Sequence, residues 1–277
     1  MRGNMKYESI EQKMLRILYP PVLYLLICLV TQVTVSSVLI WLDAKVTDVR
    51  GVSATTAANY IEHINEIINT HSVLMNFIGA GVGLLVFGII FKRDKNESKR
   101  IKTHEVIYSY AIGLTAGMGI SLFISILPID NILGSYESAS KLLLNGKFIQ
   151  LFVVLGIVVP LTEEIIYRGI VFNRIKKYLD VNKAIIISAL LFGFFHLNLM
   201  QGLYAFIIGI IMGFLYYKFE NICAPIALHM AVNQLTVIFE TIGFSDFLNK
   251  NIWAYVLTML SALVIGGILL YHRFFKS

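Results

Sequence analysis

The sequence contains eight apolar runs, each close to the roughly 20 residues that a helix needs to cross a hydrocarbon core about 30 Å thick. Because backbone groups in lipid must be paired within the protein, such runs can only be helices. We therefore expect an all-α polytopic membrane protein with about eight transmembrane helices in one bundle. The expected spans are Ile17–Leu42, Val73–Phe91, Val106–Leu127, Phe148–Tyr167 with a helical extension to about Leu179, Lys183–Leu199, Leu203–Phe219, Ala224–Gly243 and Trp253–Phe275.

The composition excludes other classes of protein. Hydrophobic residues make up 57% of the chain and charged residues 14%, which argues against a soluble enzyme and against intrinsic disorder. The two cysteines, Cys28 and Cys223, lie in or beside apolar runs and are expected to pack as small hydrophobic residues. The first run has no small-residue cleavage site, so we expect it to be retained. Residues 1–277 are expected to form a single membrane domain with a polar outer loop at Asp43–Ser72.

The distribution of basic residues predicts the orientation. If both termini are cytoplasmic, 18 of the 23 Lys and Arg residues fall on the cytoplasmic side. Such a bias follows the positive-inside rule, so the net charge of +6 indicates a lipid bilayer and not nucleic acid as the partner. The short loops are typical of a bacterial cell-membrane protein.

Small residues four positions apart recur in three runs, where they would let helix backbones approach closely. We expect them to serve helix packing and not chemistry. They are Gly79 and Gly83, Gly113 and Gly117, and Gly209 and Gly213.

Two adjacent acids stand in the fourth run, VVPLTEEIIYRGIVF. Glu164 and Arg168 are four residues apart on one helical face and can pair, whereas Glu163 is turned about 100° away. Pro160 removes a backbone hydrogen bond just before them, so carbonyls there need another partner. The alternative is an interfacial helix end whose carboxylates extend toward nearby basic residues.

His196 is expected at a depth similar to that of Glu163. A tight turn at Asp180–Asn182 would pack the fourth and fifth helices antiparallel, with the two residues offset by only about 4 to 5 Å. His196 would then follow Phe192 by one turn on the same helical face. The alternative is a histidine that serves packing alone.

The seventh run places His229 and Asn233 four residues apart on one face. An imidazole and an amide aimed at one point can stabilise an oxyanion. Ordinary interhelical hydrogen bonding is the alternative. Glu240, near the outer end of this run, is expected to be interfacial.

Three motifs therefore stand in order, Glu163-Glu164-x-x-x-Arg168, Phe192-x-x-x-His196 and His229-x-x-x-Asn233. Together they resemble the motifs of the CAAX prenyl endopeptidase and bacteriocin-processing (CPBP or Abi) family of intramembrane proteases, over residues 148–243. The resemblance implies hydrolysis of a peptide bond in a membrane-associated protein or peptide. It also implies that Glu163 is the general base assisted by His196, that His229 and Asn233 hold the oxyanion, and that Glu164 and Arg168 support the site.

Metal dependence stays open from the sequence. Glu163, His196 and His229 could form a three-ligand zinc site, but there is no HExxH helix and such a site would need another base. We therefore favour a mechanism without a cofactor, with zinc or another divalent metal as the alternative.

A transporter or proton relay, or a catalytically silent scaffold, would carry similar intramembrane residues. CAAX-type processing, bacteriocin or pheromone maturation, and immunity all remain open as roles.

Overall fold

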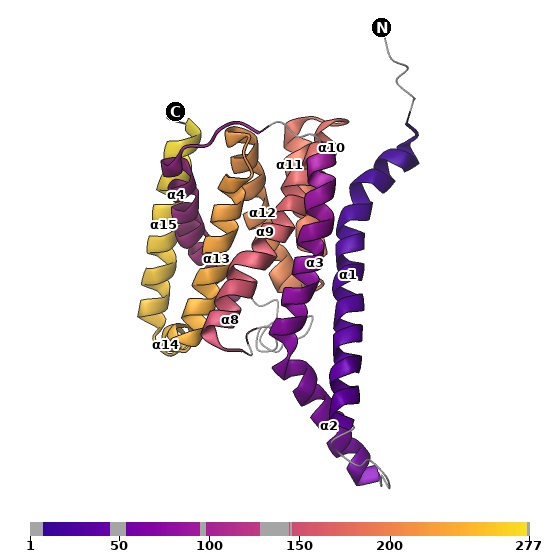
Figure 1. Cartoon of the computed structure of the whole chain (residues 1–277). Helices are drawn as coiled ribbons and strands as arrows, with labels where there is room; N and C mark the ends of the chain where they lie inside the picture. Colours follow the sequence, from indigo (N-terminus) through magenta and orange to yellow (C-terminus); the bar gives the residue numbers. More distant parts are fainter. Residues whose placement is uncertain (1–7, 45–53, 95–97, 128–143, 145, 276–277) are drawn as a thin grey trace.

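The computed structural model describes residues 8–44, 54–94, 98–127, 144 and 146–275, and most of these are helical, with no β-strand among them. Figure 1 shows the helices running side by side, with the C-terminus at one end of the bundle and α2 and α14 at the other. The helices are α1 (Ile10–Ala44), α2 (Ala54–Thr70), α3 (Ser72–Arg93), α4 (Thr103–Ile112), α5 (Met118–Ser125), α8 (Phe148–Val153), α9 (Val159–Glu164), α10 (Asn173–Lys176), α11 (Val181–Phe194), α12 (Leu199–Phe219), α13 (Cys223–Thr241), α14 (Phe244–Lys250) and α15 (Ile252–Phe275).

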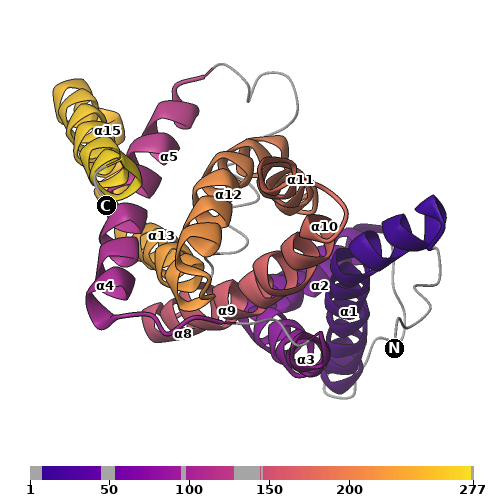
Figure 2. The same ribbon diagram turned by 90° about the horizontal axis from the view of Figure 1, so that it is seen from above.

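Several of these helices continue one another through π-helical segments. Gly113–Gly117 joins α4 to α5, Val154–Val158 joins α8 to α9, and Ile165–Phe172 joins α9 to α10. Phe148–Lys176 is therefore one rod of 29 residues, with Glu163 near its middle. Seen from above, this rod passes between α1 and α3 on one side and α12 and α13 on the other (Figure 2).

Within the described residues, seven helices are long and apolar enough to cross a membrane. The expectation of an all-α multi-pass membrane protein is thus confirmed. The expected span Lys183–Leu199 differs, because its helix α11 has only 14 residues and ends at Phe194. The expected polar loop also differs, since it contains the helix α2, while residues 45–53 of that loop lie outside the described part.

The main hydrophobic core lies between the long rod and the helices α11, α12 and α13. It includes Ile170, Phe172, Met212 and Leu215, each at most 1% exposed. Apolar side chains of α1 and α15 are largely exposed, as expected where helices face lipid. The protein therefore has one dense interior around the middle of its sequence, with α1 and α15 on its margins (Figure 2).

The glycine pairs lie at close helix contacts, as predicted. A Cβ added at Gly113 would stand 2.4 Å from the carbonyl oxygen of Leu228 on α13, and one added at Gly83 would stand 2.7 Å from the ring of Tyr24. Distances this short require the neighbouring group to move. A side-chain ring can turn aside, but the backbone at Leu228 can move only with its helix.

We expect Gly113→Ala to lower the free energy of unfolding by about 1 to 3 kcal/mol, because the added methyl group overpacks the contact with α13. Thermal unfolding of the purified protein in detergent measures the change. Gly81→Ala is the matched control, since a Cβ there meets no atom within 4 Å. It should be neutral or slightly stabilising, because alanine is the better helix former. Equal unfolding temperatures for the two variants would contradict the close contact.

Candidate active site

The two adjacent acids of α9 have different surroundings. The side chain of Glu163 is 16% exposed and faces a cavity of about 360 Å³, whereas that of Glu164 is fully buried. Between α9 and α3, the buried hydroxyl of Thr162 donates to the carbonyl of Ala80 at 3.1 Å and fixes the position of this turn. One carboxylate is therefore held inside the protein, and its neighbour is presented to a space that can take a ligand.

Glu164 pairs with Arg168, as the spacing predicted. Nη1 of Arg168 donates to Oε1 of Glu164 at 2.7 Å, and both side chains are fully buried. Nη2 of Arg168 donates to the carbonyl of Gly209 on α12 at 3.0 Å. Because the two charges compensate each other away from water, removal of either would leave an unpaired buried charge.

His229 lies between the two glutamates. Its Nδ1 is 2.8 Å from Oε1 of Glu164, and its Nε2 is 3.7 Å from Oε2 of Glu163. Because a carboxylate can only accept, Nδ1 carries the hydrogen in this contact. The buried pair of Glu164 and Arg168 thus orients the imidazole, and the opposite nitrogen faces Glu163.

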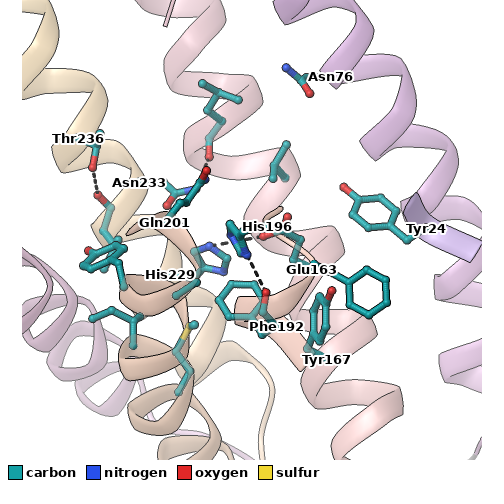
Figure 3. Close-up of a pocket in the computed structure, with 18 of the residues that line it drawn as sticks. Tyr24, Asn76, Glu163, Tyr167, Phe192, His196, Gln201, His229, Asn233 and Thr236 are labelled. Carbon is teal, nitrogen blue, oxygen red and sulfur yellow. Dashed lines mark hydrogen bonds and ion pairs between the residues drawn. The ribbon is translucent and has the colours of Figure 1, made fainter. Parts of the chain in front are cut away.

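His196 lies beside Glu163 and His229, but it does not lie on a helix. The expectation that it follows Phe192 by one turn on the same helical face is therefore wrong. The helix α11 ends at Phe194, and His196 follows in a turn that also contains Leu197 with a φ of 57°. Nδ1 of His196 is 2.7 Å from the carbonyl of Phe192, so it is the donor, and Nε2 is left free to accept. Figure 3 shows His196, His229 and Glu163 side by side at the cavity.

Pro160 leaves backbone carbonyls without a helical donor, and α13 supplies the donors. Nδ2 of Asn233 donates to the carbonyl of Leu155 at 2.9 Å, and Nε2 of Gln234 donates to that of Gly156 at 3.2 Å. The hydrogen-bond donors that these carbonyls were predicted to need are therefore supplied by the neighbouring helix α13. Asn233 also lines the cavity and keeps a second amide hydrogen, so it can have a ligand contact besides this structural one.

The ring of Phe192 contacts side chains from all three motifs. The guanidinium of Arg168 lies 4.8 Å from its ring centroid, a cation–π contact. The rings of His196 and His229 approach the same ring edge-on, with centroids 4.8 and 5.5 Å away. The motif spacing placed Phe192 near His196, but its contacts with the other two motifs arise only when α9, α11 and α13 pack together.

The cavity also receives side chains from the first two spans. Tyr24 of α1 and Asn76 of α3 line it opposite the histidines (Figure 3). Neither residue belongs to a motif, and no spacing in the sequence marks either one as functional. A tyrosine or an asparagine within an apolar run is a weak signal, because both residues also occur at ordinary helix contacts.

Two observations bear on whether these side chains could hold a metal ion. Among the residues that the structure describes, no three His, Cys, Asp or Glu side chains are grouped so that they could hold one. The expected trio of Glu163, His196 and His229 lines one cavity, and the hydrogen bond at Nδ1 of each histidine leaves Nε2 for a ligand, as in histidines that bind metals. Metal dependence is therefore decided by elemental analysis of the purified protein.

Comparisons with known proteins agree with the motifs. Residues 145–235 match the family described as type II CAAX prenyl endopeptidase Rce1-like. The protein named "Putative membrane peptidase YdiL" of Bacillus subtilis (strain 168) is 30% identical over 120 residues, which are 43% of this chain and 47% of that protein. The chain thus matches about half the length of this relative. No solved structure matches it.

The predicted family resemblance is therefore confirmed over the segment that contains all three motifs. That segment covers α8 to α13, while the first two spans, which carry Tyr24 and Asn76, lie outside the family match. Over this segment the chain is similar to membrane peptidases, and its helices are those of a multi-pass membrane protein.

Proposed function

We propose that this protein is an intramembrane endopeptidase that hydrolyses a peptide bond of a membrane-associated protein or peptide with an activated water. The observation that carries this proposal is the contrast between the two acids. Glu164 is neutralised inside the protein, and Glu163 stands beside two imidazoles at a cavity. Because no Arg or Lys of the described residues forms an ion pair with Glu163, this carboxylate can take a proton from water, which is the role of a general base.

In the proposed reaction, Glu163 takes a proton from a water in the cavity, while Nε2 of His196 accepts a hydrogen bond from the second O–H of that water, whose hydrogen stays on the oxygen. The oxygen of the water then bonds to the carbonyl carbon of the substrate. Glu163 passes its proton to the amide nitrogen as the carbon–nitrogen bond breaks, so the glutamate ends as it began. The products are a new carboxylic acid, which carries the second hydrogen until it ionises in water, and a new amine.

His229 and Asn233 would stabilise the negative charge that develops on the substrate carbonyl oxygen. With Nδ1 held on Glu164, a protonated His229 presents a hydrogen on Nε2 toward the cavity. Asn233 has one amide hydrogen left after its contact with Leu155. Donors fixed in advance are the most effective, because they need no rearrangement when the charge forms.

The proposal is tested on membranes from cells with and without this protein. Mass spectrometry should find peptide fragments that appear only when the protein is present and that disappear with His196→Ala. If the fragments are the same in all three samples, the chain is not a peptidase under those conditions, and a transporter becomes the better hypothesis. Dissipation of a pH gradient by the purified protein in lipid vesicles would support that alternative.

We expect purified, active protein to contain substoichiometric zinc and to keep its activity after exhaustive chelation. Glu163 and the two imidazoles would act on water without an ion, so there is no nucleophile for a chelator to remove. Elemental analysis and cleavage should be measured on the same sample, with His229→Ala beside it. One equivalent of zinc that falls in parallel with activity, and is lost in the variant, would contradict the metal-free mechanism and leave the peptidase proposal standing.

A further inference from the structure

The cavity at Glu163 extends toward one end of the bundle. On α13 its lining runs from His229 to Glu240, a rise of about 16 Å along the helix. Thr236 and Glu240 are exposed there. On α3 the lining residue is Asn76, about one turn from the start of the helix at Ser72. The open part of the cavity therefore lies near the end of α13 and the start of α3.

The opposite end of the bundle carries most of the basic residues that the structure describes. Ion pairs at this end join Arg174 to Asp94 at 2.9 Å, Arg273 to Glu105 at 2.6 Å and Lys99 to Glu220 at 2.9 Å. In Figure 1 this is the end with the C-terminus, where α10 meets α11. Under the positive-inside rule it is the cytoplasmic end.

Between the site and the basic end, the interior is filled with side chains. The residues there are at most 1% exposed and include Ile166, Ile170, Phe172, Ile175 and Leu215. Figure 3 shows Tyr167 and Phe192 at one end of the cavity, with Asn76 and Thr236 toward the other. A polypeptide that approached from the basic end would have to displace this core.

We infer that the site takes its substrate from the extracytoplasmic side, as the outer part of a membrane-spanning segment or of an exported peptide and not as a cytoplasmic tail. This inference rests on the proposed function. The groups near the opening fit such a substrate, because Asn76, Gln201 and Thr236 can hydrogen-bond the backbone of an extended peptide. The aromatic deep end, formed by Tyr24, Tyr167 and Phe192, fits an apolar side chain.

Access is tested with single cysteines in a Cys28→Ala, Cys223→Ala background. A membrane-impermeant maleimide should label Thr236→Cys and Lys250→Cys in intact cells and should fail to label Lys177→Cys until the cells are permeabilised. Labelling of Thr236→Cys only after permeabilisation would overturn the inference. So would labelling of Lys177→Cys in intact cells, because the basic end would then face outward.

Substrate class is tested by mapping new peptide termini in cells that carry the wild-type protein or Glu163→Gln. Termini that depend on Glu163 should fall in the outer half of membrane spans or in exported segments. If they fall in cytoplasmic tails, the inference is wrong while the peptidase proposal stands. If no terminus depends on Glu163, the proposed function fails and the inference fails with it.

Discussion

Glu163→Gln is expected to lower the rate of cleavage by about 10²- to 10⁴-fold, the usual contribution of a general base. The amide has nearly the same shape as the carboxylate but cannot hold a proton taken from water. Because Glu163 makes no short ion pair, folding should be unchanged. Cleavage is measured with the fragments that depend on the wild-type protein, and folding is measured by thermal unfolding in detergent.

The matched control is Glu66→Gln, the same change on α2, where the side chain is 77% exposed. It should retain the wild-type rate. A Glu163→Gln protein that cleaves at the wild-type rate would show that another group activates the water. A loss of activity accompanied by a lower unfolding temperature would show instead that Glu163 is structural.

Glu164→Gln is expected to destabilise the protein by about 3 to 5 kcal/mol, as is usual when one partner of a buried ion pair is removed. Arg168 would keep its charge with 0% of its side chain exposed, and His229 would lose the carboxylate that accepts from Nδ1. Both thermal stability and cleavage should therefore fall. This differs from Glu163→Gln, which should affect cleavage alone.

The double variant Glu164→Gln, Arg168→Met separates the two effects. It removes the stranded charge, so part of the lost stability should return, whereas cleavage should stay low because a neutral amide oxygen holds Nδ1 of His229 less strongly than the carboxylate does. Asp180→Asn is the control for a carboxylate paired at the surface. Its partner Lys183 is 64% exposed and asparagine can cap α11 equally well, so little change is expected. A double variant no more stable than Glu164→Gln would contradict the charge explanation.

Local spacing predicted the parts of the site that lie within one helix. The pair of Glu164 and Arg168 follows from a separation of four residues, and the exposed carbonyls follow from Pro160. Both were confirmed, because they depend on helix geometry alone. The family resemblance was also confirmed, since it rests on three short motifs that stand in order along the chain.

Features that depend on a break in an apolar run could not be predicted. Hydropathy stays high through the end of α11, so it does not reveal that the helix stops at Phe194 and that His196 lies in a turn. The left-handed backbone at Leu197 is equally hidden, because leucine rarely adopts it. Contacts between helices were missed too, such as those of Phe192 with Arg168 and His229, since they arise from packing and not from spacing.

The central claim is that water activated by Glu163 cleaves a peptide bond. It is tested most directly by incubating the purified protein with solubilised membrane proteins in water enriched in ¹⁸O and analysing the fragments by mass spectrometry. Fragments made by the wild-type protein should carry one ¹⁸O atom in the new carboxyl group, and Glu163→Gln should yield none of them. Fragments that form equally with Glu163→Gln, or a wild-type sample without any ¹⁸O-labelled fragment, would contradict the claim.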